Sequence, residues 1–319
     1  MATGLFPESR LLLCAGTLPR ANFAERVEAA RSAGFDAISL FPQQYLQATM
    51  KERLTPADMR DILVAAGIAL DEVDPLLDWF GPAASAAEKL MFDMASELGA
   101  VSINTPTAFA PDIGLPELTA ALVRLCERAA KHGLRIDLEF LPWTIVPDLR
   151  TALQVVTDAG QTNLGVTLDV WHFFRGGDSL ETLRSLSAAE AAHITNLQLN
   201  DAPAKRRALP LRDKLALAGA TLGQLTDGIK VHGARRFFNV SSAMKSTHPD
   251  ATALMAEASS GRVLPGDGDM PLASWLQALQ GVGCTPTVGL EIFSLALARR
   301  PPAEVAASAM AAYRQLAGR

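Results

Sequence analysis

Short apolar segments alternate with segments of helical periodicity eight times along the chain, and this alternation is the feature that most restricts its fold. The apolar segments span residues 11–15, 37–41, 69–73, 101–104, 135–140, 164–170, 193–199 and 287–292. The helical segments span 22–33, 55–67, 85–98, 116–132, 148–159, 180–192, 274–279 and 303–316, and several end at a glycine. Eight βα units predict a (β/α)8 TIM barrel, one domain over residues 1–319, rather than an open doubly wound sheet.

One long connection interrupts the alternation. Residues 201–272 connect the seventh strand to the next predicted helix, where a loop of a few residues is usual. This extra length predicts an insertion at about 203–262, after the seventh strand. Long loops at the carboxyl ends of barrel strands form active-site lids. A peripheral segment that serves an oligomer interface is the alternative for the first part of the insertion.

Composition restricts the partners. A formal net charge of −5 without a concentrated stripe of Lys and Arg argues against nucleic acid and favours a small molecule. Three cysteines in no metal-like spacing indicate a reducing compartment. No apolar run has transmembrane length and the first residues do not resemble a signal peptide, so we expect a cytoplasmic protein that does not enter the membrane.

Four of the predicted strands carry an oxygen-bearing side chain between two apolar residues near their carboxyl ends. These side chains are Glu139, Asp169, Gln198 and Glu291. Since alternate residues of a barrel strand point inward, all four are expected to face the barrel axis. Two residues earlier on the same face stand small or polar residues: Asp137, Thr167, Asn196 and Gly289.

Several carboxylates that converge in a buried place repel one another unless a cation lies between them. We therefore predict that Glu139, Asp169, Gln198 and Glu291 bind a divalent metal, with a purely hydrogen-bonded polar plug as the alternative. An all-oxygen ligand set suits Mg²⁺ or Mn²⁺ better than Zn²⁺. His172, three residues beyond Asp169, is expected above the metal, where it contacts a substrate oxygen or joins proton transfer; a surface histidine is the alternative.

Five segments carry a resemblance to a known family. The sequence resembles the xylose isomerase-like superfamily, in particular the sugar phosphate isomerase/epimerase group with hydroxypyruvate isomerases, ketose 3-epimerases, inosose dehydratases and 3-dehydroshikimate dehydratases. The segments are LEFLPW (138–143), DVWHFFRGG (169–177), LQLND (197–201), RVLPGDGDMPL (262–272) and GLEIF (289–293).

The resemblance implies roles for six residues. Glu139, Asp169, Gln198 and Glu291 match the family's metal ligands, and His172 and Arg262 match positions that contact substrate. Many relatives carry histidine where Gln198 stands, whereas hydroxypyruvate isomerases carry glutamine. Residues 205–248 have no counterpart that we identify in typical members, and relatives are often dimers or tetramers, so a homo-oligomer is one expected assembly.

These assignments predict an enzyme that acts on a polyhydroxy carbonyl substrate. The resemblance implies that Glu139 and Glu291 also move a proton through an enediolate, which makes the protein a metal-dependent isomerase or epimerase. Arg262 offers a guanidinium fork to the substrate, with a solvated loop arginine as the alternative. A metal-dependent lyase or dehydratase would use the same ligands. A non-catalytic carbohydrate-binding module is less favoured, and a DNA-repair endonuclease is disfavoured because it needs more histidines and a basic groove.

Overall fold

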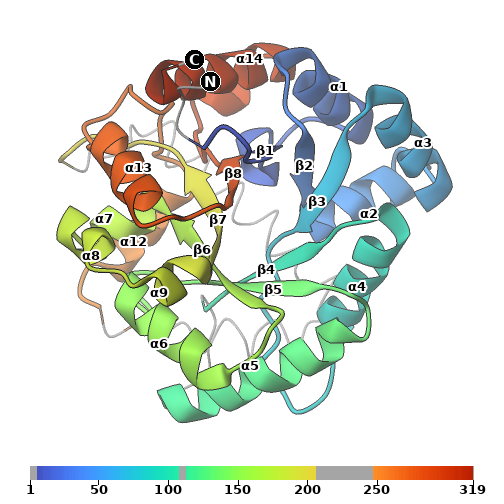
Figure 1. Cartoon of the computed structure of the whole chain (residues 1–319). Helices are drawn as coiled ribbons and strands as arrows, with labels where there is room; N and C mark the ends of the chain where they lie inside the picture. Colours follow the sequence, from blue (N-terminus) through green and yellow to red (C-terminus); the bar gives the residue numbers. More distant parts are fainter. Residues whose placement is uncertain (1–5, 108–112, 206–245, 247, 319) are drawn as a thin grey trace.

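The computed structural model describes residues 6–107, 113–205, 246 and 248–318. Eight parallel strands close into a barrel in which each strand pairs with the next one along the chain and β8 pairs with β1, as Figure 1 shows along the barrel axis. The strands are β1 (Leu11–Leu13), β2 (Ala37–Leu40), β3 (Ala69–Val73), β4 (Ser102–Pro106), β5 (Arg135–Glu139), β6 (Leu164–Asp169), β7 (Ile194–Leu199) and β8 (Thr287–Leu290). The predicted (β/α)8 barrel is confirmed.

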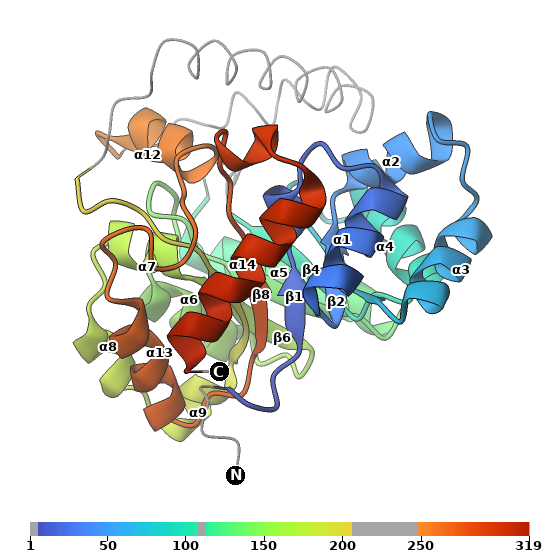
Figure 2. The ribbon, with the colours of Figure 1, turned by 90° about the horizontal axis from the view of Figure 1, so that it is seen from above.

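The helices form a ring outside the strands (Figures 1 and 2). In chain order the helices described are α1 (Phe23–Ala33), α2 (Pro42–Met50), α3 (Pro56–Ala66), α4 (Ala86–Leu98), α5 (Leu115–Ala130), α6 (Leu149–Ala159), α7 (Val170–Arg175), α8 (Leu180–Arg184), α9 (Ala188–Ala192), α12 (Ala251–Ala258), α13 (Leu272–Gly281) and α14 (Pro302–Ala317). No helix among these combines the length and apolar character that a bilayer crossing requires.

Local sequence signals explain where the outer helices begin and end. At α1 the side chain of Asn22 accepts from the backbone N–H of Glu25, and the side chain of Glu25 accepts from the backbone N–H of Asn22. The helix stops at Gly34, whose φ of 86° is a left-handed conformation that residues with a Cβ adopt only under strain. The glycine stop signals in the sequence therefore have a direct structural cause.

Several details differ from the sequence prediction, and helices α7 (Val170–Arg175) and α12 (Ala251–Ala258) are among the elements that were not expected. Helix α2 (Pro42–Met50) was not expected; it begins with Pro42 in its first turn, a position that proline favours. The helix predicted over 180–192 is two short helices, because the Ser187 side chain accepts from the backbone N–H of Glu190 and starts α9 anew. Strand β8 ends at Leu290, so Glu291 lies one residue beyond it.

The apolar core lies between the barrel and the helices. Leu138, Leu168, Leu197 and Leu290 are buried in this outer core, each next to one of the predicted site residues. The inside of the barrel holds a separate small cluster of Leu12, Cys14 and Ala37. Each of the strands β3 to β7 also places a buried polar side chain in the interior: Glu72, Asn104, Asp137, Thr167 and Asn196.

The predicted insertion at about 203–262 falls mostly on residues 206–245, which lie outside the described part of the chain. Its last part, α12, lies at the carboxyl ends of the strands, away from the end where β1 begins and α14 ends (Figure 2). There Leu254 and Ala258 of α12 pack against Trp171 and Ala202. This helix therefore covers part of the barrel mouth.

Candidate metal centre and active site

The four predicted oxygen donors lie at the carboxyl ends of neighbouring strands. Glu139 ends β5, Asp169 ends β6, Gln198 is the second-last residue of β7, and Glu291 follows β8. Asp169 is directly opposite Gln198 in the strand pairing, and Gln198 is opposite Gly289. All four are at most 7% exposed. Strand parity thus brings residues from four strands to one buried place.

Gln198 lies between the carboxylates of Glu139 and Glu291. With its amide nitrogen turned toward them, Gln198 donates to Glu139 Oε1 over 3.2 Å and to Glu291 Oε2 over 3.3 Å. With its amide oxygen turned toward them, three oxygens meet at these separations and repel one another unless a cation lies between. Oxygens that bind one divalent ion at roughly 2.0–2.2 Å are themselves about 3 Å apart. The donor set fits a divalent metal.

The carboxylate of Asp169 is held by donors on both oxygens. Its Oδ1 accepts from the backbone N–H groups of Trp171 (2.7 Å) and His172 (3.0 Å), which lie in the first turn of α7. Its Oδ2 accepts from Asn200 Nδ2 at 3.0 Å and from Arg262 Nη1 at 2.7 Å. Four donors from three segments of the chain therefore fix the orientation of this carboxylate.

Arg262 is buried among these acids and is not a solvated loop residue. It is 2% exposed, and its Nη1 also donates to Glu291 Oε2 at 3.1 Å. Its Nη2 lies 3.3 Å from His172 Nε2. The guanidinium carbon lies 5.8 Å from the ring centroid of Trp171 and 5.2 Å from that of Phe293. The guanidinium is therefore fixed by carboxylates at one edge and by aromatic rings at its faces.

His172 is likewise buried, at 3% exposure, and its Nε2 lies 3.3 Å from Glu139 Oε1. Glu139, Asp169 and His172 each offer a ligand atom within 4.8 Å of the others, so the three could share one cation. Trp143 and Trp171 meet the His172 ring edge-on, with centroids 5.6 Å and 5.2 Å away. His172 therefore stands in an aromatic wall beside the carboxylates and not on the surface.

Two further polar residues belong to this place and were missed in the sequence. Asn104 Nδ2 donates both to Glu139 Oε2 at 2.8 Å and to Asp74 Oδ1 at 2.9 Å. Burial, with the nearby charge of Glu139, raises the pKa of Asp74 to about 7. Asp74 follows β3 and Asn104 lies in β4, so the pattern of a polar residue near a strand end could have identified both.

Burial also raises the pKa of Glu291 well above its usual range, because desolvation outweighs the opposing charge of Arg262. The acids Asp74, Glu139 and Asp169 add to this shift. Six buried acidic side chains (Glu72, Asp74, Asp137, Glu139, Asp169 and Glu291) thus share the barrel interior and its mouth with the guanidinium of Arg262. A divalent cation would lower their mutual repulsion.

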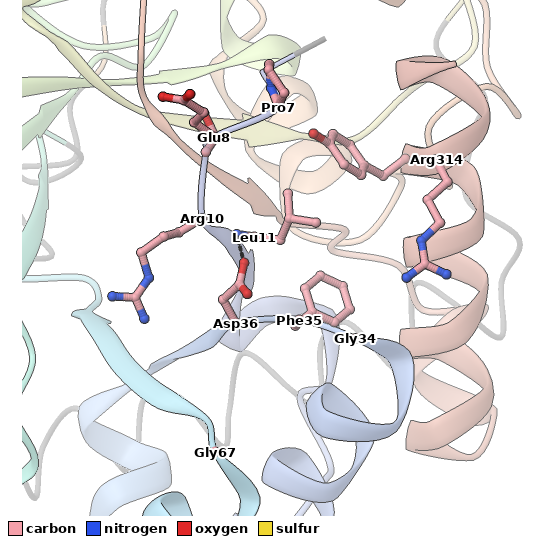
Figure 3. A pocket seen from close by; sticks show the side chains of 11 residues that line it. Pro7, Glu8, Arg10, Leu11, Gly34, Phe35, Asp36, Gly67 and Arg314 are labelled. Atoms are coloured by element: carbon pink, nitrogen blue, oxygen red, sulfur yellow. Dashed lines mark hydrogen bonds between the residues drawn. The ribbon is translucent and has the colours of Figure 1, made fainter. Parts of the chain in front are cut away.

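A cavity of about 660 Å³ lies at the opposite end of the barrel, between the start of β1 and the end of α14 (Figure 3). Its lining includes Arg10, Asp36 and Arg314. Asp36 Oδ2 accepts from the backbone N–H of Leu11 at 2.8 Å, and Arg10 pairs with Asp71 at 3.2 Å. These contacts secure the start of β1, far from the predicted ligands.

The comparisons with known proteins agree with this architecture. The sequence model of the family described as xylose isomerase-like TIM barrel matches residues 27–316. A 3-dehydroshikimate dehydratase of Pseudomonas aeruginosa is 33% identical over 199 residues, which are 59% of this chain and 29% of that protein. A second 3-dehydroshikimate dehydratase, from Pseudomonas putida, is 29% identical over 197 residues, again 59% and 29% of the two chains. The matched segment is thus less than a third of these relatives.

Solved structures share the fold along nearly the whole chain. The IolI protein with a zinc atom has a TM-score of 0.70 at 18% identity, covering 97% of this chain and 98% of its own. The probable 3-dehydroshikimate dehydratase AsbF of Bacillus anthracis has a TM-score of 0.62 at 16% identity, covering 95% and 97%. At sequence identities of 16–18%, these structures show a shared fold and do not show a shared function.

Proposed function

The chain belongs to the xylose isomerase-like TIM barrel family, and we propose that it is a divalent-metal-dependent enzyme that removes a proton beside the carbonyl group of a hydroxylated substrate. One observation carries the proposal: the carboxylates of Glu139 and Glu291 converge on the amide of Gln198 at 3.2 Å and 3.3 Å. Such a set can hold a cation and place two proton-accepting groups around one substrate carbon.

Glu139, Asp169, Gln198 and Glu291 would hold the metal, with His172 near enough to Glu139 and Asp169 to contribute. When bound, the metal would polarise the substrate carbonyl and so make the neighbouring C–H more acidic. The oxygen donors favour Mg²⁺ or Mn²⁺. The zinc atom in IolI, a protein of the same fold, makes Zn²⁺ the third ion to test.

The chain's own residues would perform the proton transfer. Glu291, whose pKa is raised by burial, is suited to accept the proton and to return it in the next step. Glu139 would serve as the second acid or base, and Asn104 fixes its other oxygen. Arg262 and His172 would hold the substrate oxygens, because their polar edges lie next to these carboxylates.

Removal of the proton leaves a carbanion next to the carbonyl group, and the next step of this carbanion determines which product forms. We propose a dehydratase: the carboxylate that took the proton returns it to the hydroxyl on the next carbon, which departs as water while a C=C bond forms. The two curated relatives, both 3-dehydroshikimate dehydratases, support this outcome and suggest a cyclic keto acid as substrate. An isomerase or epimerase of a keto-polyol is the second candidate, because carboxylates on both sides of Gln198 could return the proton to another carbon or face.

Incubation of the Mn²⁺-loaded protein in deuterated water with 3-dehydroshikimate, and separately with hydroxypyruvate and ketohexoses, would separate the two reactions. We expect loss of one water from 3-dehydroshikimate and growth of the ultraviolet absorbance of a dihydroxybenzoate. Deuterium exchange into a sugar without loss of water would favour the second candidate. If no substrate exchanges its α-proton, the proposal of a proton-transferring enzyme is wrong.

A further inference from the structure

The guanidinium of Arg262 contacts two of the carboxylates that are proposed to hold the metal. Arg262 Nη1 lies 2.7 Å from Asp169 Oδ2 and 3.1 Å from Glu291 Oε2. We propose that Arg262 and the divalent cation compete for these two oxygens, so that metal binding releases the guanidinium to receive a negatively charged substrate oxygen. This inference rests on the metal site of the proposed function.

The hydrogen bonds of Asp169 carry the argument. An ionised carboxylate offers about four lone-pair sites, two on each oxygen. At Asp169, backbone N–H groups of α7 take two sites on Oδ1, while Asn200 Nδ2 and Arg262 Nη1 take those on Oδ2. Asp169 can therefore bind a metal only after one donor has left.

Of the four donors, Arg262 is the one that a metal would displace. The two backbone N–H groups are fixed by the junction of β6 and α7, and the amide of Asn200 carries no charge. The guanidinium is positive, and two positive groups a few ångströms apart repel strongly in a buried place. Since Nη1 also holds Glu291 Oε2, its departure frees an oxygen of a second proposed ligand.

The side chain can move while its backbone stays in place. The backbone N–H of Arg262 donates to the carbonyl of Phe293 at 3.0 Å, which fixes the start of the loop. Within the described part of the chain, Nε has no hydrogen-bond partner and Nη2 contacts only His172. A released guanidinium would stay near the rings of Trp171 and Phe293 and present a free planar fork to a carboxylate or enolate oxygen.

Titration calorimetry with Mn²⁺ on the metal-stripped full chain tests the competition. We expect Arg262→Gln to bind Mn²⁺ about tenfold more tightly than the wild type or better, in the range of ordinary coupling between sites. Arg262→Lys should be intermediate, because it keeps the charge without the fork. Arg175→Gln is the matched control: it removes a largely buried guanidinium that pairs with Glu257, and its Mn²⁺ affinity should not change.

A second measurement needs no variant. Phenylglyoxal labels free guanidinium groups, and mass spectrometry of the peptide that contains Arg262 should show slow labelling in the stripped protein and faster labelling with Mn²⁺. Two results would contradict the competition between Arg262 and the metal: Mn²⁺ binding by Arg262→Gln that is equal to or weaker than that of the wild type, or a rate of Arg262 labelling that Mn²⁺ does not change. Neither result would argue against the metal site itself. If neither wild type nor variants bind Mn²⁺, the metal site of the proposed function fails as well.

Discussion

The carboxylates at the barrel mouth differ in the hydrogen-bond donors and charges around them, and these surroundings determine the chemical behaviour of each carboxylate. Asp169 is saturated by four hydrogen bonds and is suited to hold charge in a fixed place. Burial raises the pKa of Glu291 well above its usual range, which suits a group that accepts a proton. Glu139 lies between Gln198 and Asn104. Chemically similar residues thus receive distinct roles from their surroundings.

Replacing Glu291 by Gln should reduce turnover by at least about a thousandfold, since a general acid or base contributes roughly 10²–10⁴ to the rate and Glu291 is also a proposed metal ligand. The measurement is the rate of α-proton exchange in deuterated water. Glu257→Gln serves as control, because that acid pairs with Arg175 outside the site and its loss should leave the rate nearly unchanged. A Glu291→Gln variant with near-normal exchange would remove Glu291 from the chemistry.

Glu72 lies inside the barrel, where its Oε2 accepts from Asn196 Nδ2 at 2.6 Å and its Oε1 has no partner among the described residues. Burial raises the pKa of Glu72 well above its usual range, and the charge of Asp74 adds to this. The folded state thus binds the proton more tightly, so its stability falls as pH rises from the ordinary glutamate range through the raised pKa.

The substitution Glu72→Gln places a neutral side chain at this position, so the variant should not lose stability as the pH rises. At pH 7 the variant should unfold at a higher temperature than the wild type, and below about pH 4 the two should unfold alike. Thermal unfolding followed by circular dichroism over this pH range is the measurement. A difference of the opposite sign, or one that does not change with pH, would contradict the raised pKa.

At the scale of elements, the loop that follows Arg262 is organised by one buried acid, Asp201. Its Oδ2 accepts from the backbone N–H groups of Gly266 (2.9 Å) and Gly268 (3.0 Å). Its Oδ1 accepts from those of Ala202 (2.7 Å) and Met270 (3.1 Å). A Cβ at Gly268 would lie 2.3 Å from Asp201 Oδ1, so the close approach requires glycine there. A carboxylate at the end of β7 therefore shapes the loop that carries Arg262.

Asp201→Asn should lower the free energy of unfolding by about 2–4 kcal/mol, because an amide nitrogen faces backbone N–H groups that then lack an acceptor. Catalytic rate should fall too, since Arg262 loses its support. Denaturant unfolding and turnover are the measurements. Asp269→Asn is the control: its carboxylate accepts from the backbone N–H of Ala204 at an exposed place, and the change should be within about 1 kcal/mol. Equal effects at both positions would refute the special role of Asp201.

At the scale of the whole molecule, barrel closure assembles the site from both halves of the chain. Strands β5 to β8 supply the predicted metal ligands, and β3 and β4 supply Asp74 and Asn104. The closed sheet joins β8 to β1, so these side chains lie around one axis. Binding of an ion at that axis should stabilise the barrel as a unit.

Mn²⁺ at about a hundred times its dissociation constant should stabilise the folded protein by about 2.7 kcal/mol, because the unfolded chain lacks the assembled site. The measurement is the unfolding temperature of metal-stripped protein with added Mn²⁺, Mg²⁺ or Zn²⁺, and EDTA should reverse the increase. Asp169→Asn, which weakens a proposed ligand, should reduce it. The absence of a shift with all three ions would contradict a metal site on this barrel.

The sequence determined what depends on local periodicity. Spacing and glycine stops predicted the eight βα units, and strand parity predicted that Glu139, Asp169, Gln198 and Glu291 share the inner face. Both are properties of neighbouring residues, because side-chain direction repeats every two residues in a strand. Their role as ligands stays a prediction, as do the homo-oligomer and the place of the insertion.

Tertiary structure alone decided which distant side chains touch. Arg262 pairs with Asp169 across 93 residues of sequence, and Asn104 joins Asp74 to Glu139 across 30 and 35. No local pattern encodes such pairs, since they depend on how the strands are staggered when the barrel closes and on loop conformation. The sequence therefore predicted the oxygen donors near the strand ends, while packing placed the guanidinium of Arg262 among them.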